Sequence, residues 1–141
     1  MNIYRLTTVD DEILAAFQRL MPQLTSLPAP ALAELEEMVA SENCVLLMAR
    51  GDDGQIAGSG ALGLYRTPTG LHAWIEDVVV DDAYRRQGIG EALTLALVEA
   101  ARERGAHTLS LTSRPGREAA NRLYQRLGFV RRETNLYRYP L

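Results

Sequence analysis

A strand-like run, a short polar turn and a long amphipathic helix follow one another in the middle of the chain. Residues 72–80 have the strongest β-strand character in the sequence and end in three consecutive valines. Residues 81–87 are mostly polar, which predicts a loop. Residues 88–104 then carry apolar side chains at helical spacing, at Ile89, Ala92, Leu93, Ala96, Leu97 and Ala100. This order predicts a layered fold that contains both helices and strands.

The segments on either side complete the expected topology. Further strands are expected at residues 3–6, 44–49, 55–64, 108–112, 129–130 and 136–139, and further helices at residues 9–24, 31–40 and 118–127. Three strands joined by hairpins precede a strand–helix–strand unit, so we expect a mixed sheet with helices on both faces. The prediction is a single α/β (α+β) domain over residues 1–141 with about six or seven strands.

Composition and charge exclude several classes of protein. The chain has 141 residues, 47% hydrophobic and 23% charged, which is ordinary for a globular domain. The net charge of −3 argues against a nucleic-acid partner. No apolar run approaches the roughly 20 residues that span a membrane, and the N-terminus does not resemble a signal peptide. The single cysteine, Cys44, allows no internal disulfide and is consistent with a cytoplasmic location.

The turn Arg85-Arg86-Gln87-Gly88-Ile89-Gly90 predicts an anion site. A helix N-terminus presents unpaired N–H groups, and glycines let a phosphate approach the backbone. Two other phosphate motifs do not fit, because a P-loop needs a lysine where Glu91 stands and a dinucleotide fingerprint needs a small residue at Leu93. The alternative is a glycine-rich helix start that holds no ligand.

Two segments together resemble the GCN5-related N-acetyltransferase (GNAT) family. Arg85-x-x-Gly88-x-Gly90 between a strand and a helix resembles the central motif of this family. Ala120-x-x-Leu123-Tyr124-x-x-x-Gly128-Phe129 resembles its second signature. The resemblance covers residues from about 73 to 130, with one strand between the motifs. The first half of the chain fits only in its order of elements.

The resemblance implies acetyl-coenzyme A as cosubstrate. Two histidines and one cysteine predict no dedicated metal site. The resemblance also implies that the backbone of residues 86–91 holds the pyrophosphate, that Val78–Val80 pair with the pantetheine arm, and that Tyr124 protonates the leaving thiolate. The full implied cofactor set is Val78, Val79, Val80, Arg85, Arg86, Gln87, Gly88, Ile89, Gly90, Glu91, Asn121 and Tyr124. Arg117 stands where the family often has asparagine, so whether Asn121 or Arg117 contacts the cofactor stays open.

Glu76 and Asp77 are the candidate acids for deprotonating an amine. Buried carboxylates are costly unless they are paired, yet both lie in an apolar strand. Strand alternation places Glu76 on one face with Trp74 and Val78, so only one acid faces the substrate unless a bulge intervenes. We expect Glu76 to act as base through water and Asp77 to orient substrate. The string from Glu76 to Val80 is similar to that of amino-sugar phosphate acetyltransferases. The alternative is that both acids pair with arginines at a strand end.

The remaining candidates have structural alternatives. Tyr124 sits at helical spacing with apolar residues, so it is either a catalytic acid or a core tyrosine. Cys44 is expected to be a buried thiol rather than a nucleophile, and His72 is a candidate for the acceptor site. The leading function is acetyl transfer to a small primary amine in a ternary complex. A non-catalytic coenzyme A-binding module, a protein or peptide N-acetyltransferase, and a homodimer stay open.

Overall fold

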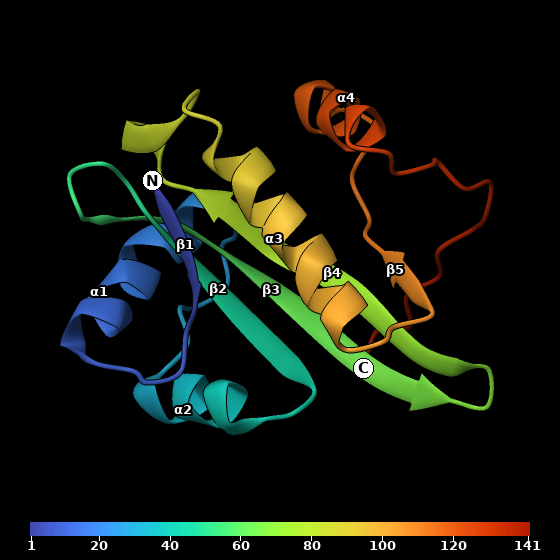
Figure 1. Ribbon diagram of the computed structural model, residues 1–141, viewed down its shortest axis with the longest axis horizontal. Coiled ribbons are helices and arrows are strands. Elements are labelled where there is room, and N and C mark those ends of the chain that lie inside the picture. Colours follow the sequence, from blue (N-terminus) through green and yellow to red (C-terminus); the bar gives the residue numbers. More distant parts are fainter. The chain divides into compact units, whose positions relative to one another are not determined.

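The computed structural model describes residues 1–141, and the chain divides into two compact units, residues 1–111 and residues 112–141. The first unit contains one five-stranded sheet in the order β1-β2-β3-β4-β5 (Figure 1). Its strands are β1 (Asn2–Arg5), β2 (Cys44–Arg50), β3 (Ile56–Thr67), β4 (Gly70–Val80) and β5 (Thr108–Ser110). Its helices are α1 (Asp11–Leu20), the 3-10 turn η1 (Met21–Gln23), α2 (Leu32–Ala40), the 3-10 turn η2 (Asp82–Tyr84) and α3 (Ile89–Glu103).

The sheet is mixed, as predicted. Strands β1 to β4 are antiparallel neighbours, and β5 runs parallel to β4. A parallel neighbour needs a crossover connection, which α3 supplies. The β3–β4 hairpin extends to the pair Thr67 and Gly70, so both strands are longer than the periodicity predicted.

Helices cover both faces of the sheet, which confirms the expected layers. On one face, α1 and α2 bury Phe17, Leu20 and Leu35 against a cluster that includes Met48 and Val79. On the other face, α3 lies close to the glycines of β3. A Cβ atom at Gly58 would stand 3.2 Å from Leu93 Cδ1, and one at Gly60 would stand 3.0 Å from Leu97 Cδ1. The small residues of β3 therefore let α3 approach the sheet closely.

Helix α1 is shorter than the predicted helix over residues 9–24. Asp10 caps its start, because the Asp10 carboxylate accepts a hydrogen bond from the Ile13 amide at 3.0 Å. The α-helix ends at Leu20, and η1 follows with Pro22 near its start. Proline lacks the amide hydrogen that the interior of an α-helix needs. The α-helix therefore ends before Pro22, although apolar side chains continue at helical spacing beyond that point.

The second unit contains one helix, α4 (Glu118–Arg126), and no strand. The predicted strands at residues 129–130 and 136–139 are absent, so the sheet has five strands rather than six or seven. The apolar side chains in these segments are exposed, at Val130, Leu136, Tyr137 and Tyr139. Strand-like composition is a local property, but a strand forms only where a neighbour accepts its hydrogen bonds. No helix in the structure has the length and hydrophobicity to span a bilayer.

Candidate active site

A β-bulge in β4 separates Glu76 from the valines that follow it. Ser59 pairs with Val79 and Ala61 pairs with Glu76, so Asp77 and Val78 together stand opposite the single residue Gly60. Asp77 adopts a left-handed conformation with φ 53°, which is uncommon for a residue other than glycine. A bulge bends its strand and leaves a residue out of the hydrogen-bond ladder.

The bulge also corrects the prediction that Glu76 and Val78 share a face. Glu76 lies opposite Ala61, and directly opposed residues of paired strands share a face. Val78 Cγ2 instead lies 3.4 Å from the place of a Cβ atom on Gly60, the neighbour of Ala61. Successive strand residues point to opposite faces, so Val78 lies on the α3 side and Glu76 on the other side.

Strand β4 loses its outer neighbour before it reaches the bulge. The β4–β5 ladder consists of three pairs and ends at Trp74 and Ser110. Beyond that point β4 continues to Val80, and its only strand partner is β3. The backbone of residues 75–80 therefore has no strand neighbour on the β5 side, and an edge of this kind can accept an extended ligand as an additional strand.

The glycine turn ends at the start of α3, where the N-cap residue is itself a glycine. Gly88 is the N-cap of α3 with φ 77°, and it has no side chain that could accept from the first amides of the helix. A Cβ atom on Gly88 would meet nothing within 4 Å, and one on Gly90 would meet only Val80 Cγ2 at 3.6 Å. The space above this backbone is open, so the turn fits a phosphate-bearing cosubstrate.

The predicted cofactor residues of the turn are mostly exposed. Arg85, Arg86, Gln87 and Gly88 are exposed, whereas Ile89 is buried under the sheet and begins α3. Arg86 has a positive φ of 64°, and Arg85 forms an ion pair with Asp82 at 2.8 Å. Glu76 and Asp77 are exposed as well, so the expectation of carboxylates inside a buried strand is wrong.

The residues predicted from the second motif lie in the second unit. Tyr124 packs its ring edge-on against Phe129, with centroids 5.8 Å apart. It is partly exposed, and its backbone carbonyl accepts from the Phe129 amide at 2.9 Å. The Asn121 amide donates to the Arg114 carbonyl at 2.9 Å, and Arg117 is the N-cap residue of α4. Asn121 therefore holds the loop before α4.

The other candidates have local roles. Burial raises the pKa of the Cys44 thiol, and the charge of Arg5 opposes this effect only in part, so the thiol is not activated. His72 Nδ1 lies 2.7 Å from Thr108 Oγ1, and Nε2 lies 2.8 Å from Thr69 Oγ1. No group of three or more potential metal ligands is present.

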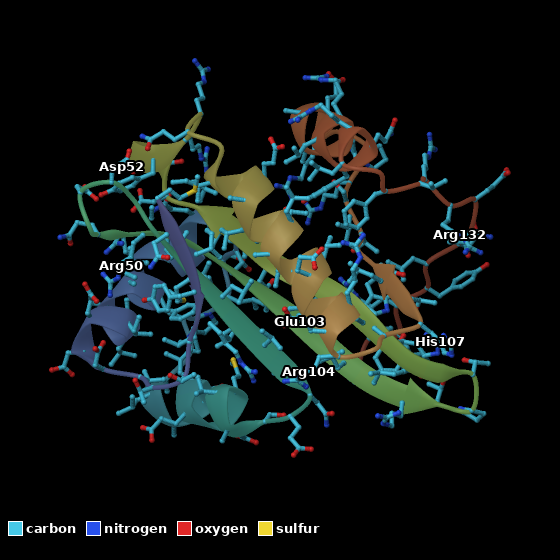
Figure 2. The ribbon with its side chains drawn as sticks, viewed as in Figure 1. Arg50, Asp52, Glu103, Arg104, His107 and Arg132 are labelled. Atoms are coloured by element: carbon cyan, nitrogen blue, oxygen red, sulfur yellow. The ribbon has the colours of Figure 1, made fainter.

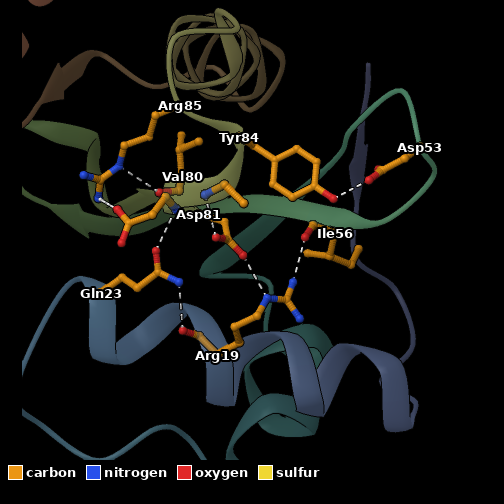
Figure 3. A network of polar contacts seen from close by, with 10 residues as sticks. Arg19, Gln23, Asp53, Ile56, Val80, Asp81, Tyr84 and Arg85 are labelled. Atoms are coloured by element: carbon orange, nitrogen blue, oxygen red, sulfur yellow. Dashed lines mark hydrogen bonds and ion pairs between the residues drawn. The ribbon is translucent and has the colours of Figure 1, made fainter.

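Three side chains that the sequence did not single out contact the start of the turn. Asp81 is buried and accepts from Arg19, and Gln23 accepts from the Asp82 amide (Figure 3). Asp81 carried one signal, because it is an acid placed directly after an apolar strand. Arg19 and Gln23 carried none, since 62 and 59 residues separate them from their partners.

Comparison with known proteins identifies the class. A sequence model of the Acetyltransferase (GNAT) family matches residues 10–129. The chain is 31% identical to glucosamine 6-phosphate N-acetyltransferase 1 of Oryza sativa subsp. japonica, over 96% of this chain and 87% of that protein. It is 38% identical to the [ribosomal protein bS18]-alanine N-acetyltransferase of Escherichia coli, over 48% of this chain and 46% of that protein.

A solved structure supports the same assignment over the whole chain. The crystal structure of a Trypanosoma brucei acetyltransferase superposes with a TM-score of 0.79 and 29% identity, covering 99% of each chain. The chain therefore belongs to the GNAT acetyltransferase family, as its two motifs predicted. It is an acyltransferase of the N-acetyltransferase type.

Proposed function

We propose that this enzyme uses acetyl-coenzyme A to acetylate a primary amine by direct attack in a ternary complex. The observation that carries the proposal is the junction of β4 and α3. There, the strand edge at residues 75–80, which has no neighbour on the β5 side, leads through the turn at residues 81–87 to the helix start at Gly88. An extended arm attached to a pyrophosphate matches a strand edge followed by an anion site.

The cofactor roles follow from these two features. Val78, Val79 and Val80 offer backbone groups to the pantetheine arm, and residues 86–91 offer backbone N–H groups to the pyrophosphate. Arg85 and Arg86 add positive charge beside that anion. The bulge at Asp77 interrupts the ladder with β3, so an N–H near Val78 is our candidate donor for the oxyanion.

The acid–base roles remain those that the sequence suggests. An ammonium has no lone pair, so Glu76 is proposed to accept the amine proton through water, with Asp77 orienting the acceptor. Tyr124 is proposed to protonate the thiolate as it leaves. The exposure of Glu76 supports access by water and by substrate. Acetyl transfer forms one C–N bond and breaks one C–S bond, and it needs no metal.

The acceptor is proposed to be a small-molecule amine. The match to a glucosamine 6-phosphate N-acetyltransferase covers 96% of this chain, whereas the match to an enzyme for a ribosomal protein covers 48%. The acceptor contacts lie outside the shared cofactor motif, so the longer match bears more directly on them. A protein α-amine is the second candidate. A cytoplasmic location and a homodimer remain predictions.

Thermal unfolding with and without acetyl-coenzyme A tests the cosubstrate, with ATP and NAD as controls. Ligand at 100 times its Kd adds about 2.7 kcal/mol to the free energy of unfolding. This gain raises the midpoint by several degrees, at about 2–8 °C per kcal/mol. A shift with ATP or NAD but none with acetyl-coenzyme A would overturn the proposal.

A screen of amines then tests the chemistry. Amino sugars and their phosphates are compared with short peptides that have a free N-terminus. Tyr124→Phe and Glu76→Gln are expected to lower kcat by about 10²–10⁴ while the Kd for acetyl-coenzyme A stays within a few-fold. Unchanged turnover in both variants would remove these residues from the mechanism.

A further inference from the structure

The first residues of the turn are tied to helix α1, which lies far away in the sequence. Arg19 Nε donates to Asp81 Oδ2 at 2.9 Å, and the Arg19 guanidinium also donates to the Ile56 carbonyl at 2.7 Å (Figure 3). The second Asp81 oxygen, Oδ1, accepts from the Ala83 amide at 3.1 Å. Asp81 is only 7% exposed. Both of its oxygens are therefore occupied, one by α1 and one by the turn.

A neighbouring side chain of η1 reinforces this connection. Gln23 Oε1 accepts from the Asp82 amide at 2.8 Å, and Gln23 Nε2 donates to the Arg19 carbonyl at 3.2 Å. The Asp81 amide donates to the Ala57 carbonyl at 2.8 Å. Three separate parts of the chain thus hold the point at which β4 ends and the turn begins.

The turn itself has no fully buried side chain between Asp81 and Ile89. Residues 82, 83 and 85–88 are exposed, and only Tyr84 is partly buried among the residues between Asp81 and Ile89. The hydrogen bonds at its start and the bond from the Tyr84 hydroxyl to Asp53 therefore hold the path of its backbone. Burial opposes ionisation of Asp81, but the bonds from the Ala83 amide and from Arg19 outweigh it and hold the pKa of Asp81 below its ordinary value.

We propose that Arg19 and Asp81 are positioning residues that preorganise the turn at residues 81–88 for the cosubstrate before it binds. The inference rests on the proposed function of the turn. Its physical basis is that the apparent Kd equals the intrinsic Kd divided by the fraction of protein in the binding conformation. When the Asp81 contacts are lost, that fraction falls and the affinity falls with it, whereas turnover at saturation is preserved.

A second ion pair between an arginine and a carboxylate, which also involves α1, provides a matched control. Arg50 (labelled in Figure 2) forms an ion pair with Glu12 of α1 at 2.6 Å and donates to the Gly54 carbonyl at 2.8 Å. Like Arg19 with Asp81, this pair connects α1 to a distant part of the first unit. It differs in that neither residue forms a hydrogen bond or ion pair with residues 81–88. Glu12→Gln therefore weakens the attachment of α1 without removing a hydrogen bond to residues 81–88.

The experiment measures the Kd of acetyl-coenzyme A by calorimetry, and KM and kcat with the best amine, for Asp81→Asn, Arg19→Lys and Glu12→Gln. Asp81→Asn is expected to raise Kd and KM about tenfold with kcat within twofold of wild type. Arg19→Lys keeps the charge and is expected to raise Kd less. Glu12→Gln is expected to leave Kd unchanged. Equal effects of Asp81→Asn and Glu12→Gln on Kd would overturn the inference.

Two further measurements separate the possible failures. Hydrogen exchange of the ligand-free protein reports on the turn directly. The amides of Asp82, Ala83 and Tyr84 are expected to exchange about tenfold faster in Asp81→Asn and unchanged in Glu12→Gln. Unchanged exchange in Asp81→Asn would overturn the inference. If wild type binds no acetyl-coenzyme A, the proposed function fails, while the exchange data still decide whether Asp81 orders the turn.

A milder variant covers the case in which Asp81→Asn does not fold. Gln23→Ala removes the bond to the Asp82 amide from a partly buried side chain and leaves the Arg19–Asp81 ion pair in place. It is expected to raise Kd about threefold, because one of the contacts that order the turn is lost. Wild-type Kd and wild-type exchange at Asp82 in this variant would contradict the inference.

Discussion

Helix α3 buries five of its residues, whereas neither α4 nor the segment after it contains a buried residue. The buried residues of α3 are Ile89, Leu93, Thr94, Leu97 and Ala101. In residues 112–141 the side chains of Val130, Leu136, Tyr137, Tyr139 and Leu141 are all more than 60% exposed. Each helix carries one of the two family motifs, but only the first motif is built on a core.

This difference shows which contacts position each motif. The densely packed core and the contacts of Asp81 fix the position of the turn before α3. The second motif relies on local contacts, namely the bond from Asn121 to Arg114 and the ring contact of Tyr124 with Phe129. Substitutions around the first motif are therefore expected to change the free energy of unfolding more than substitutions around the second motif.

The largest expected effect is at the centre of α3. Leu93 is fully buried, so Leu93→Ala removes packed methyl groups and is expected to lower the free energy of unfolding by about 2–5 kcal/mol. Leu95 lies on the same helix and is 43% exposed, so Leu95→Ala is expected to change it by less than about 0.5 kcal/mol. Urea denaturation measures both variants. Equal losses would contradict the burial that distinguishes α3.

A smaller loss of unfolding free energy is expected at the place where β3 packs against β4 and α3. A Cβ atom on Gly58 would stand 2.7 Å from the Val79 carbonyl oxygen, so Gly58→Ala forces backbone to move and is expected to cost about 1–3 kcal/mol. Gly63→Ala is the matched control in the same strand, since its nearest neighbour would be the Trp74 carbonyl oxygen at 4.0 Å. Thermal unfolding compares the two variants. A loss for Gly63→Ala as large as that for Gly58→Ala would refute the steric argument.

The contribution of Asp81 to the free energy of unfolding is expected to depend on pH. Because folding lowers the pKa of Asp81, its stabilisation is fully present above its ordinary pKa of 3.8 and is lost as pH falls through the folded pKa. The difference in unfolding free energy between wild type and Asp81→Asn should narrow as pH is lowered from about 6 to about 3. Urea denaturation at several pH values measures this difference. A constant difference would show that charge on Asp81 does not matter.

The smallest effect is expected in the C-terminal segment. Tyr137 is 86% exposed, so Tyr137→Ala is expected to change the free energy of unfolding by less than about 0.5 kcal/mol. Leu136→Ala, at 67% exposure, should behave in the same way. Urea denaturation is again the measurement. A loss above about 1 kcal/mol in either variant would mean that this segment packs, and would break the comparison between the two units.

Local patterns were sufficient for much of the fold. The apolar periodicity predicted a helix over residues 88–104, and α3 runs from Ile89 to Glu103. Gly88 marks its start, because a glycine accepts the left-handed conformation found there. The hairpin of β3 and β4 and the parallel placement of β5 also followed from the order of the elements.

The sequence by itself determined the class of this protein, the β4–turn–α3 unit and the residue types of the proposed anion site, because these depend on periodicity and neighbouring residues. Only the tertiary structure decided which face each side chain takes and what holds the turn. The bulge at Asp77 arises from pairing with β3, and it moves Val78 away from the face of Glu76. The Arg19–Asp81 pair joins residues 62 positions apart. Contacts of this kind form only when the chain folds, so no local pattern encodes them.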